Sequence, residues 1–255
     1  MFKIIAFTAA DSDHQHVIDS AIKIATFFNV QVEFLYHVQG PSEWSLLSRT
    51  AKDRHPDCKL KIANAREKFD GLLRDLRSCG VNASKRIIVQ EELESVALNC
   101  NSEDLLLWDS KSFWKLDIAN WVKATNIMLL STFIDPRQFN DLVINSCFQK
   151  PLKKVTLNLI LRLSNQIDLH KHFLFVNTQK EFESTSSSVN RIKKSINQSG
   201  FNKTRIEVFN SQRHDEGIAE FTKLKNCDLI IIEYIKSAEI SNLARIKVPL
   251  ILIKS

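Results

Sequence analysis

The sequence predicts an α/β protein that contains two successive parallel sheets. Apolar segments of strand length alternate with segments of helical periodicity along the whole chain. The predicted strands are nearly continuous apolar runs, which is typical of parallel strands covered on both faces. The order of elements in the first half recurs in the second, which indicates an internal repeat of roughly 120 to 130 residues. A chain of 255 residues has room for two domains of ordinary size.

The first half contains five predicted strands, each followed or preceded by a helical segment. The first helix carries its apolar face from Val17 to Phe28, and Asp11, Ser12 or Asp13 can cap its N-terminus. The predicted strands are 2–7, 30–38, 84–90, 104–110 and 126–131. The later helices are predicted from Ile62 to Leu76, at about 91–99, and through Trp114 and Trp121.

The second half repeats this order of elements. Its predicted strands are 141–148, 171–177, 204–210, 227–235 and 248–254. Its predicted helices are 152–163, 181–199, 214–225 and 238–245. Pro136 interrupts the periodicity between the halves. We therefore expect one domain at 1–133, a second at 139–255, and a hinge at 134–138.

Composition excludes several classes of protein. With 44% hydrophobic and 25% charged residues, the chain is typical of a globular protein and not of a disordered or fibrous one. The five cysteines include no CxxC pair, which predicts neither a disulfide framework nor a zinc site and favours reduced thiols in the cytoplasm. No apolar run reaches about 18 residues, so we expect a soluble protein that is not exported and does not contact a membrane.

Several stretches of the sequence are typical of a known family. They are KIIAF shortly before a helix, the second-strand ends FLYHV and FLFVN, the fourth strands EDLLLWDS and CDLIIIEYI, and the closing IKVPLILIKS. In these stretches the chain resembles the universal stress protein family in its tandem form. The resemblance covers both halves. It implies doubly wound, five-stranded sheets of the adenine nucleotide alpha hydrolase-like type, with strand order 3-2-1-4-5 and with copies paired through their last strands.

The members of this family that bind ATP differ from this sequence at two places. They carry an aspartate directly after the first strand, where this chain has Ala9, with Asp11 two residues later. They also carry a stretch of the form G-x2-G-x9-G-S/T after the fourth strand, which holds the phosphates. The corresponding segments here, DSKSFWKLDIANW and EYIKSAEISNLAR, contain no glycine. The resemblance therefore implies a member that does not bind nucleotides and needs no cofactor.

Ligands of open parallel sheets bind at the carboxyl ends of the strands, at the point where the strand order reverses. With the implied strand order, this point lies between the first and fourth strands of each half. The predicted ligand-binding residues are Asp11, Ser12, Asp109 and Ser110 in the first half and Asn145, Ser146 and Glu233 in the second. In the alternative interpretation, the aspartates at 11 and 13 cap a helix and Asp109 is a solvated loop residue.

The histidines and the acids near them suggest a metal site, but their spacing argues against one. His14 and His16 lie two residues apart in a helical turn, so their side chains point about 200° apart. His170 and His172 would share one strand face, although no third ligand is evident nearby. We expect no metal at either pair and an exposed strand entrance at the second.

No catalytic residues are predicted. The sequence has no GxSxG motif, and Cys147, near the second crevice, is expected to be a buried and unreactive thiol. Trp108, Trp114 and Trp121 are expected in the core or between the domains.

Charge is unevenly distributed between the halves. Residues 1–135 hold 16 Lys and Arg against 18 Asp and Glu, and residues 136–255 hold 19 against 11, for net charges of −2 and +8. Basic residues cluster at 150–154 and at 191–194, both expected on helices. Such clusters attract RNA in some proteins, but they are also ordinary for solvated helix faces.

These observations predict a tandem universal stress protein that is not an enzyme. It would act through a protein partner or a small ligand, with its two domains paired within the chain, and homodimers of the whole chain are also compatible with the sequence. One alternative is an ATP-binding protein with weak ATPase activity through an atypical loop. Another is an RNA-associated factor that uses the basic C-terminal half.

Overall fold

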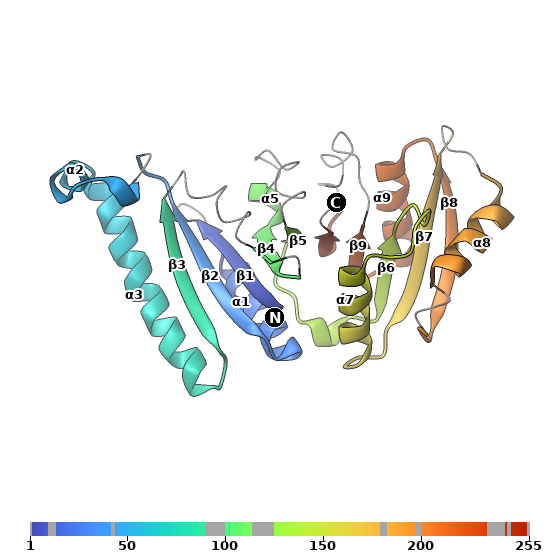
Figure 1. The fold of residues 1–255 in the computed structure, drawn as a ribbon, viewed down its shortest axis with the longest axis horizontal. Helices are drawn as coiled ribbons and strands as arrows, with labels where there is room; N and C mark the ends of the chain where they lie inside the picture. Colours follow the sequence, from blue (N-terminus) through green and yellow to red (C-terminus); the bar gives the residue numbers. More distant parts are fainter. Residues whose placement is uncertain are drawn as a thin grey trace.

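The chain folds around one ten-stranded sheet. The computed structural model describes residues 2–9, 14–41, 44–89, 100–101, 103–113, 125–178, 183–196, 200–233, 243 and 246–253. The strands lie in the order β3-β2-β1-β4-β5-β10-β9-β6-β7-β8 (Figure 1). Each run of five strands has the order 3-2-1-4-5, so the fold class expected from the sequence is confirmed. Below, β1 to β5 form the N-terminal half and β6 to β10 the C-terminal half.

The strands of the N-terminal half are β1 (Lys3–Ala9), β2 (Gln31–Val38), β3 (Ala83–Val89), β4 (Leu105–Asp109) and β5 (Asn126–Leu130). Those of the C-terminal half are β6 (Asp141–Asn145), β7 (His170–Thr178), β8 (Thr204–Ser211), β9 (Leu229–Ile232) and β10 (Leu250–Leu252). Most predicted strands differ from the observed ones by one to three residues at an end. The predicted strands 104–110 and 141–148 continue past β4 and β6, whereas β1, β7 and β8 extend beyond their predicted ends.

The described helices are α1 (Gln15–Phe28), η1 (Trp44–Leu46), α2 (Arg49–Asp53), α3 (Pro56–Ser78), α5 (Ser110–Phe113), η3 (Pro136–Gln138), α7 (Lys154–Ser164), α8 (Thr185–Ile196) and α9 (His214–Lys225). Apolar residues of α1, α3, α7 and α8 join one buried cluster on one face of the sheet. Those of α9 join a second cluster on the other face. The helices predicted at 91–99, through Trp114 and Trp121, and at 238–245 fall on residues outside the described ranges, apart from Leu243. Among the described helices, none combines the length and apolarity needed to cross a bilayer.

The two halves are joined by an antiparallel pair of strands at the centre of the sheet. Met128 of β5 lies opposite Ile251 of β10, whereas every other neighbouring pair of strands is parallel. All residues of β5 and β10 are buried. We call this β5–β10 pair the seam.

The segment between the halves packs against the N-terminal half. The backbone N–H of Ile134 donates to Ser20 Oγ of α1 at 3.0 Å, and Asp135 lies 3.7 Å from Lys23. Pro136 is buried at the start of η3. These contacts tie the predicted hinge at 134–138 to α1. The boundaries at 1–133 and 139–255 stay a prediction.

Equivalent carboxylates begin the fourth strand of each half. Asp104, just before β4, accepts a hydrogen bond from the backbone N–H of Lys3 at 3.2 Å. Asp228, just before β9, accepts one from the backbone N–H of Asp141 at 3.0 Å. Lys3 begins β1 and Asp141 begins β6, so the same contact aligns the first and fourth strands in both halves.

Each half also holds a row of three charged or polar side chains at equivalent register positions, with opposite signs. In the N-terminal half, Glu33 of β2 pairs with Lys3 of β1 and Arg86 of β3, both at 2.8 Å. Glu33 lies two residues after the register partner of Lys3, and Arg86 lies two residues after the partner of Glu33.

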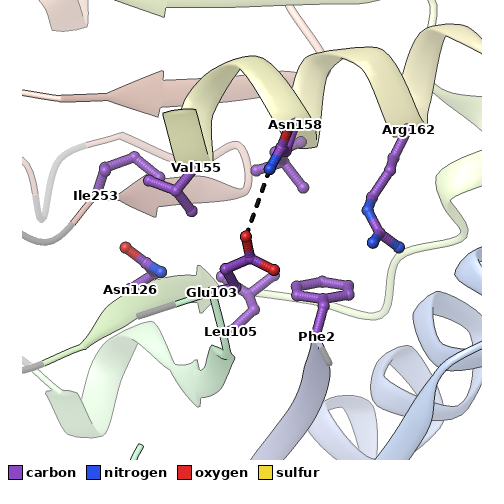
Figure 2. Close-up of a pocket in the computed structure, with 9 residues that line it drawn as sticks. Phe2, Glu103, Leu105, Asn126, Val155, Asn158, Arg162 and Ile253 are labelled. Atoms are coloured by element: carbon purple, nitrogen blue, oxygen red, sulfur yellow. Dashed lines mark hydrogen bonds between the residues drawn. The ribbon is translucent and has the colours of Figure 1, made fainter. Parts of the chain in front are cut away.

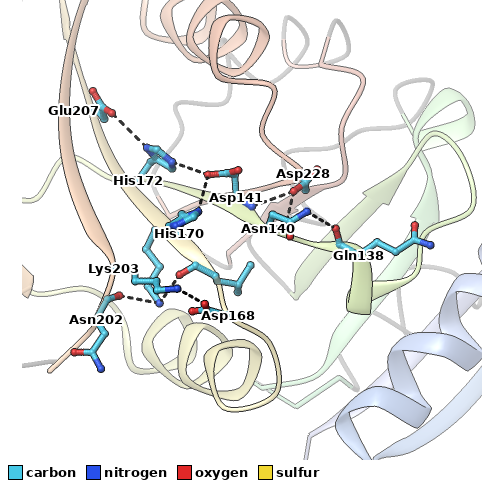
Figure 3. Close-up of polar contacts among 12 residues, drawn as sticks. Gln138, Asn140, Asp141, Asp168, His170, His172, Asn202, Lys203, Glu207 and Asp228 are labelled. Carbon is cyan, nitrogen blue, oxygen red and sulfur yellow. Dashed lines mark hydrogen bonds and ion pairs between the residues drawn. The ribbon is translucent and has the colours of Figure 1, made fainter.

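In the C-terminal half, His172 lies two residues after the register partner of Asp141, and Glu207 lies two residues after the register partner of His172. His172 Nε2 lies 3.0 Å from Asp141 and its Nδ1 lies 3.4 Å from Glu207 (Figure 3). One row is therefore cation, anion, cation, and the other places an imidazole between two carboxylates.

The N-terminal row makes stability depend on pH in the acid range. Burial raises the pKa of Glu33, but hydrogen bonds from Lys3 and Arg86 outweigh burial and hold that pKa below its ordinary value of 4.5. As the pH falls, the carboxylate of Glu33 therefore takes up a proton at a higher pH in the unfolded chain than in the folded protein. The stabilisation is present above pH 4.5 and is lost as the pH falls through the folded pKa.

We expect the free energy of unfolding to fall as the pH is lowered from about 7 to about 3, and Glu33→Gln to flatten part of that dependence. Urea denaturation across this range measures both. A variant with the same pH dependence as the wild-type protein would contradict the assignment of this contribution to Glu33.

Candidate functional site

The predicted crevice of the N-terminal half is centred on Asp109, the last residue of β4. Its side chain is buried, with Oδ1 3.3 Å from His16 Nε2 in the first turn of α1. Its Oδ2 accepts a hydrogen bond from the backbone N–H of Ser112 at 2.8 Å. Burial raises the pKa of Asp109, but the nearby imidazole of His16 and hydrogen bonding with Ser112 hold that pKa below its ordinary value. The alternative interpretation of Asp109 as a solvated loop residue is wrong.

Of the other residues predicted in this crevice, Ser110 lies within the described ranges. Ser110 is the half-buried first residue of α5. Asp11 and Ser12 lie outside the described residues. The N-cap position of α1 is held by His14, which makes no capping hydrogen bond through its side chain.

The predicted residues of the C-terminal half do come together at the ends of β6 and β9. The backbone N–H of Glu233 donates to the carbonyl of Asn145 at 3.1 Å. The side chain of Asn145 is fully buried and donates to the carbonyl of Leu174, while its Oδ1 has no hydrogen-bond partner among the described residues. Ser146 Oγ accepts the N–H of Phe148 at 3.3 Å.

Glu233 holds the start of the neighbouring helix. Its Oε1 accepts a hydrogen bond from the backbone N–H of Lys153 at 2.7 Å, and Lys153 is the N-cap residue of α7. The side chain of Lys153 cannot cap the helix itself, so the carboxylate of Glu233 supplies the acceptor that a helix N-terminus needs.

Asp109 and Glu233 are equivalent residues. Each lies five positions after the aspartate that begins its fourth strand, Asp104 or Asp228. Each directs a carboxylate to the start of the first helix of its half. The carboxyl end of each fourth strand is thus occupied by a negative charge of the protein itself.

The histidine pair in β7 differs from its prediction. His170 is exposed and its Nδ1 lies 3.7 Å from Asp141, but His172 is buried between Asp141 and Glu207 (Figure 3). The expectation of an exposed strand entrance is therefore wrong for His172, because α9 covers this face and Phe221 lies against the imidazole ring. Within the described ranges, no group of three or more His, Cys, Asp and Glu side chains is arranged to hold a metal ion.

Two further predictions need correction, and one is confirmed. Lys150 and Lys153 precede α7 and are not helical, so of the 150–154 cluster only Lys154 lies on a helix. Cys147 is half-buried, not buried, because it lies beyond the end of β6. Trp108 belongs to the core, where its ring stacks on Phe7 with centroids 3.8 Å apart. Trp114 and Trp121 lie outside the described residues.

A pocket between the halves had no counterpart in the sequence analysis. It has a volume of about 370 Å³, including its open mouth, and lies beside the seam (Figure 2). Its lining comes from the N-terminal half, through Phe2, Glu103, Leu105 and Asn126, and from the C-terminal half, through Val155, Asn158, Leu159, Arg162 and Ile253. No sequence motif could reveal it, since the two walls meet only through the pairing of β5 with β10.

The contact between Glu233 and α7 can be tested by paired substitutions. We expect Glu233→Ala to lower the free energy of unfolding by about 1 to 2 kcal/mol, because the N–H of Lys153 loses its acceptor. Glu233→Gln keeps an oxygen acceptor and should lose less. Urea denaturation followed by circular dichroism compares the three proteins. Equal losses in the two variants would contradict a capping role.

No family model and no curated protein matches the sequence. Solved structures do match it. A universal stress protein from Archaeoglobus fulgidus aligns with a TM-score of 0.68 at 11% identity, over 99% of this chain and 96% of its own. A candidate universal stress protein from Pseudomonas aeruginosa aligns with a TM-score of 0.57 at 12% identity, over 98% of this chain and 91% of its own. The cytoplasmic domain of a prokaryotic cation chloride cotransporter aligns with a TM-score of 0.53 at 9% identity, over 98% and 93%. The chain therefore has the fold of universal stress proteins.

Proposed function

We propose that the protein is a non-enzymatic stress-response protein of the cytoplasm, which acts by binding a small ligand or a partner and does not bind ATP. The observation that carries this proposal is the pair of carboxylates, Asp109 and Glu233, at the ends of the two fourth strands. A triphosphate placed there would meet a negative charge of the protein in either half.

The sequence of the adjoining segments supports the same conclusion. A phosphate-binding loop uses closely spaced backbone N–H groups, which usually requires glycine. The chain has no glycine between Gly80 and Gly200, and the next, Gly217, precedes β9. The segments that follow β4 and β9 therefore lack the residue type that such a loop needs.

The fold supports a binding protein more than an enzyme. Two of the similar structures are a universal stress protein and a candidate one. The five cysteines all lie within the described residues and form no disulfide, which is compatible with a reducing compartment.

The RNA-associated alternative receives no added support from the basic C-terminal half. Arg191, the first residue of the 191–194 cluster, pairs with Glu183 at 2.6 Å and lies over the ring of Phe175 at 4.4 Å. An arginine engaged in this way is less available to phosphates. Lys193 and Lys194 of the same cluster are exposed in the last turn of α8, as expected of a solvated helix face.

Titration calorimetry of the full chain with ATP and Mg²⁺ tests the proposal. We expect no saturable heat and no ATP-dependent rise in melting temperature, because neither crevice offers a phosphate cradle. The double variant Asp109→Asn and Glu233→Gln, which removes both charges, tests the role of the carboxylates. Saturable binding of ATP to the wild-type protein at micromolar concentration would overturn the proposal.

A further inference from the structure

The pocket beside the seam has an apolar floor and a charged rim. Leu105, Val155 and Ile253 contribute aliphatic side chains to it (Figure 2). Leu159 of α7 also lines it. A second apolar hollow of about 260 Å³ shares Leu105 and Leu159 with it and continues toward α1. An apolar ligand group of a few carbon atoms can therefore be removed from water here, which favours binding.

The rim carries one cation and one anion on opposite walls. Arg162 comes from α7 in the C-terminal half, and its guanidinium carbon lies 5.2 Å from the centre of the Phe2 ring. Glu103 comes from the segment before β4 in the N-terminal half, and its Oε1 lies 3.5 Å from Asn158 Nδ2. In the part of the chain that the structure describes, neither side chain forms an ion pair.

These two charges select against most simple ligands. A fatty acid would satisfy Arg162 but place its carboxylate near Glu103. An alkylamine would satisfy Glu103 but place its ammonium near Arg162. A small molecule that carries both charges next to an apolar group satisfies both walls and fills the floor.

We infer that this pocket binds a free α-amino acid with an aliphatic side chain. Its carboxylate would accept paired hydrogen bonds from the guanidinium of Arg162, the geometry that arginine provides for carboxylates. Its ammonium would donate to Glu103, and its side chain would lie against Leu105 and Leu159. The contact of Arg162 with Phe2 holds the guanidinium in place before the ligand arrives.

The ligand would connect the two halves. Glu103 and Arg162 belong to different halves, so a bound amino acid contributes a link across the pocket that the seam alone does not supply. This inference rests on the proposed function, because it names the small ligand through which a non-enzymatic protein of this fold would respond.

Three probes separate the two charges. L-leucine carries both, 4-methylpentanoate is leucine without its ammonium, and 3-methylbutylamine is leucine without its carboxylate. Titration calorimetry and thermal unfolding of the full chain should show saturable binding of leucine, and binding at least about tenfold weaker for the other two, since each loses a charge-assisted hydrogen bond. Glycine, which lacks the side chain, should also bind at least about tenfold more weakly.

Substitutions at the rim should change this order of affinities. Arg162→Gln should weaken leucine binding by about tenfold or more, and Glu103→Gln should make 4-methylpentanoate bind at least as well as leucine. Arg74→Gln and Glu67→Gln remove the same charges from exposed positions on α3 and should leave binding unchanged. Circular dichroism checks that all four variants fold.

The outcomes distinguish this inference from the proposed function. If leucine does not bind, or if it binds equally well to Arg162→Gln, the inference fails while the absence of ATP binding still supports the proposed function. If ATP binds at micromolar concentration, the proposed function fails whatever leucine does. The inference holds only if leucine binds and both rim variants change its affinity as described.

Discussion

The antiparallel pairing of β5 with β10 is the contact on which the rest of the architecture depends. Both strands are short and buried along their whole length. As free edges they would expose unpaired backbone groups next to apolar side chains, a combination that promotes aggregation. Paired with each other, they become the centre of one sheet, whose edge strands among the described residues are β3 and β8. The seam also fixes how the helices α1 and α7 face each other, and with them the pocket between the halves.

The two halves keep the same backbone plan while their charges diverge. The aspartates that begin β4 and β9 accept the same backbone hydrogen bond, which fixes the register of the first and fourth strands. Across the first three strands, however, one half places Glu33 between two cations and the other places His172 between two carboxylates. In each row the central side chain lies between partners on both neighbouring strands, because a half-buried carboxylate or a buried imidazole without a partner would be costly. The charges at these equivalent positions can therefore differ between the two halves, provided that all three side chains of a row differ together.

At the end of each fourth strand, a carboxylate lies at the point where folds of this type can bind ligands, and in the proposed function this carboxylate excludes anions. In both halves a carboxylate reaches the start of the first helix, where a bound anion would otherwise benefit from the free N–H groups. In the C-terminal half this carboxylate also stabilises α7, whose N-cap residue makes no capping contact through its side chain. The carboxylate that is proposed to exclude anions from this site therefore also contributes to the stability of the helix.

The sequence by itself determined the alternation of strands and helices, the repeat and the buried strands, because apolar periodicity is a local property that a packed sheet requires. It also placed Asp109, Asn145, Ser146 and Glu233 at strand ends, since these positions follow directly from the strand pattern. It could not place His172 in a buried position, because its two partners lie on neighbouring strands 31 and 35 residues away. Only the tertiary structure decided which side chains share the pocket beside the seam, because its two walls come from different halves and meet only when β5 and β10 pair.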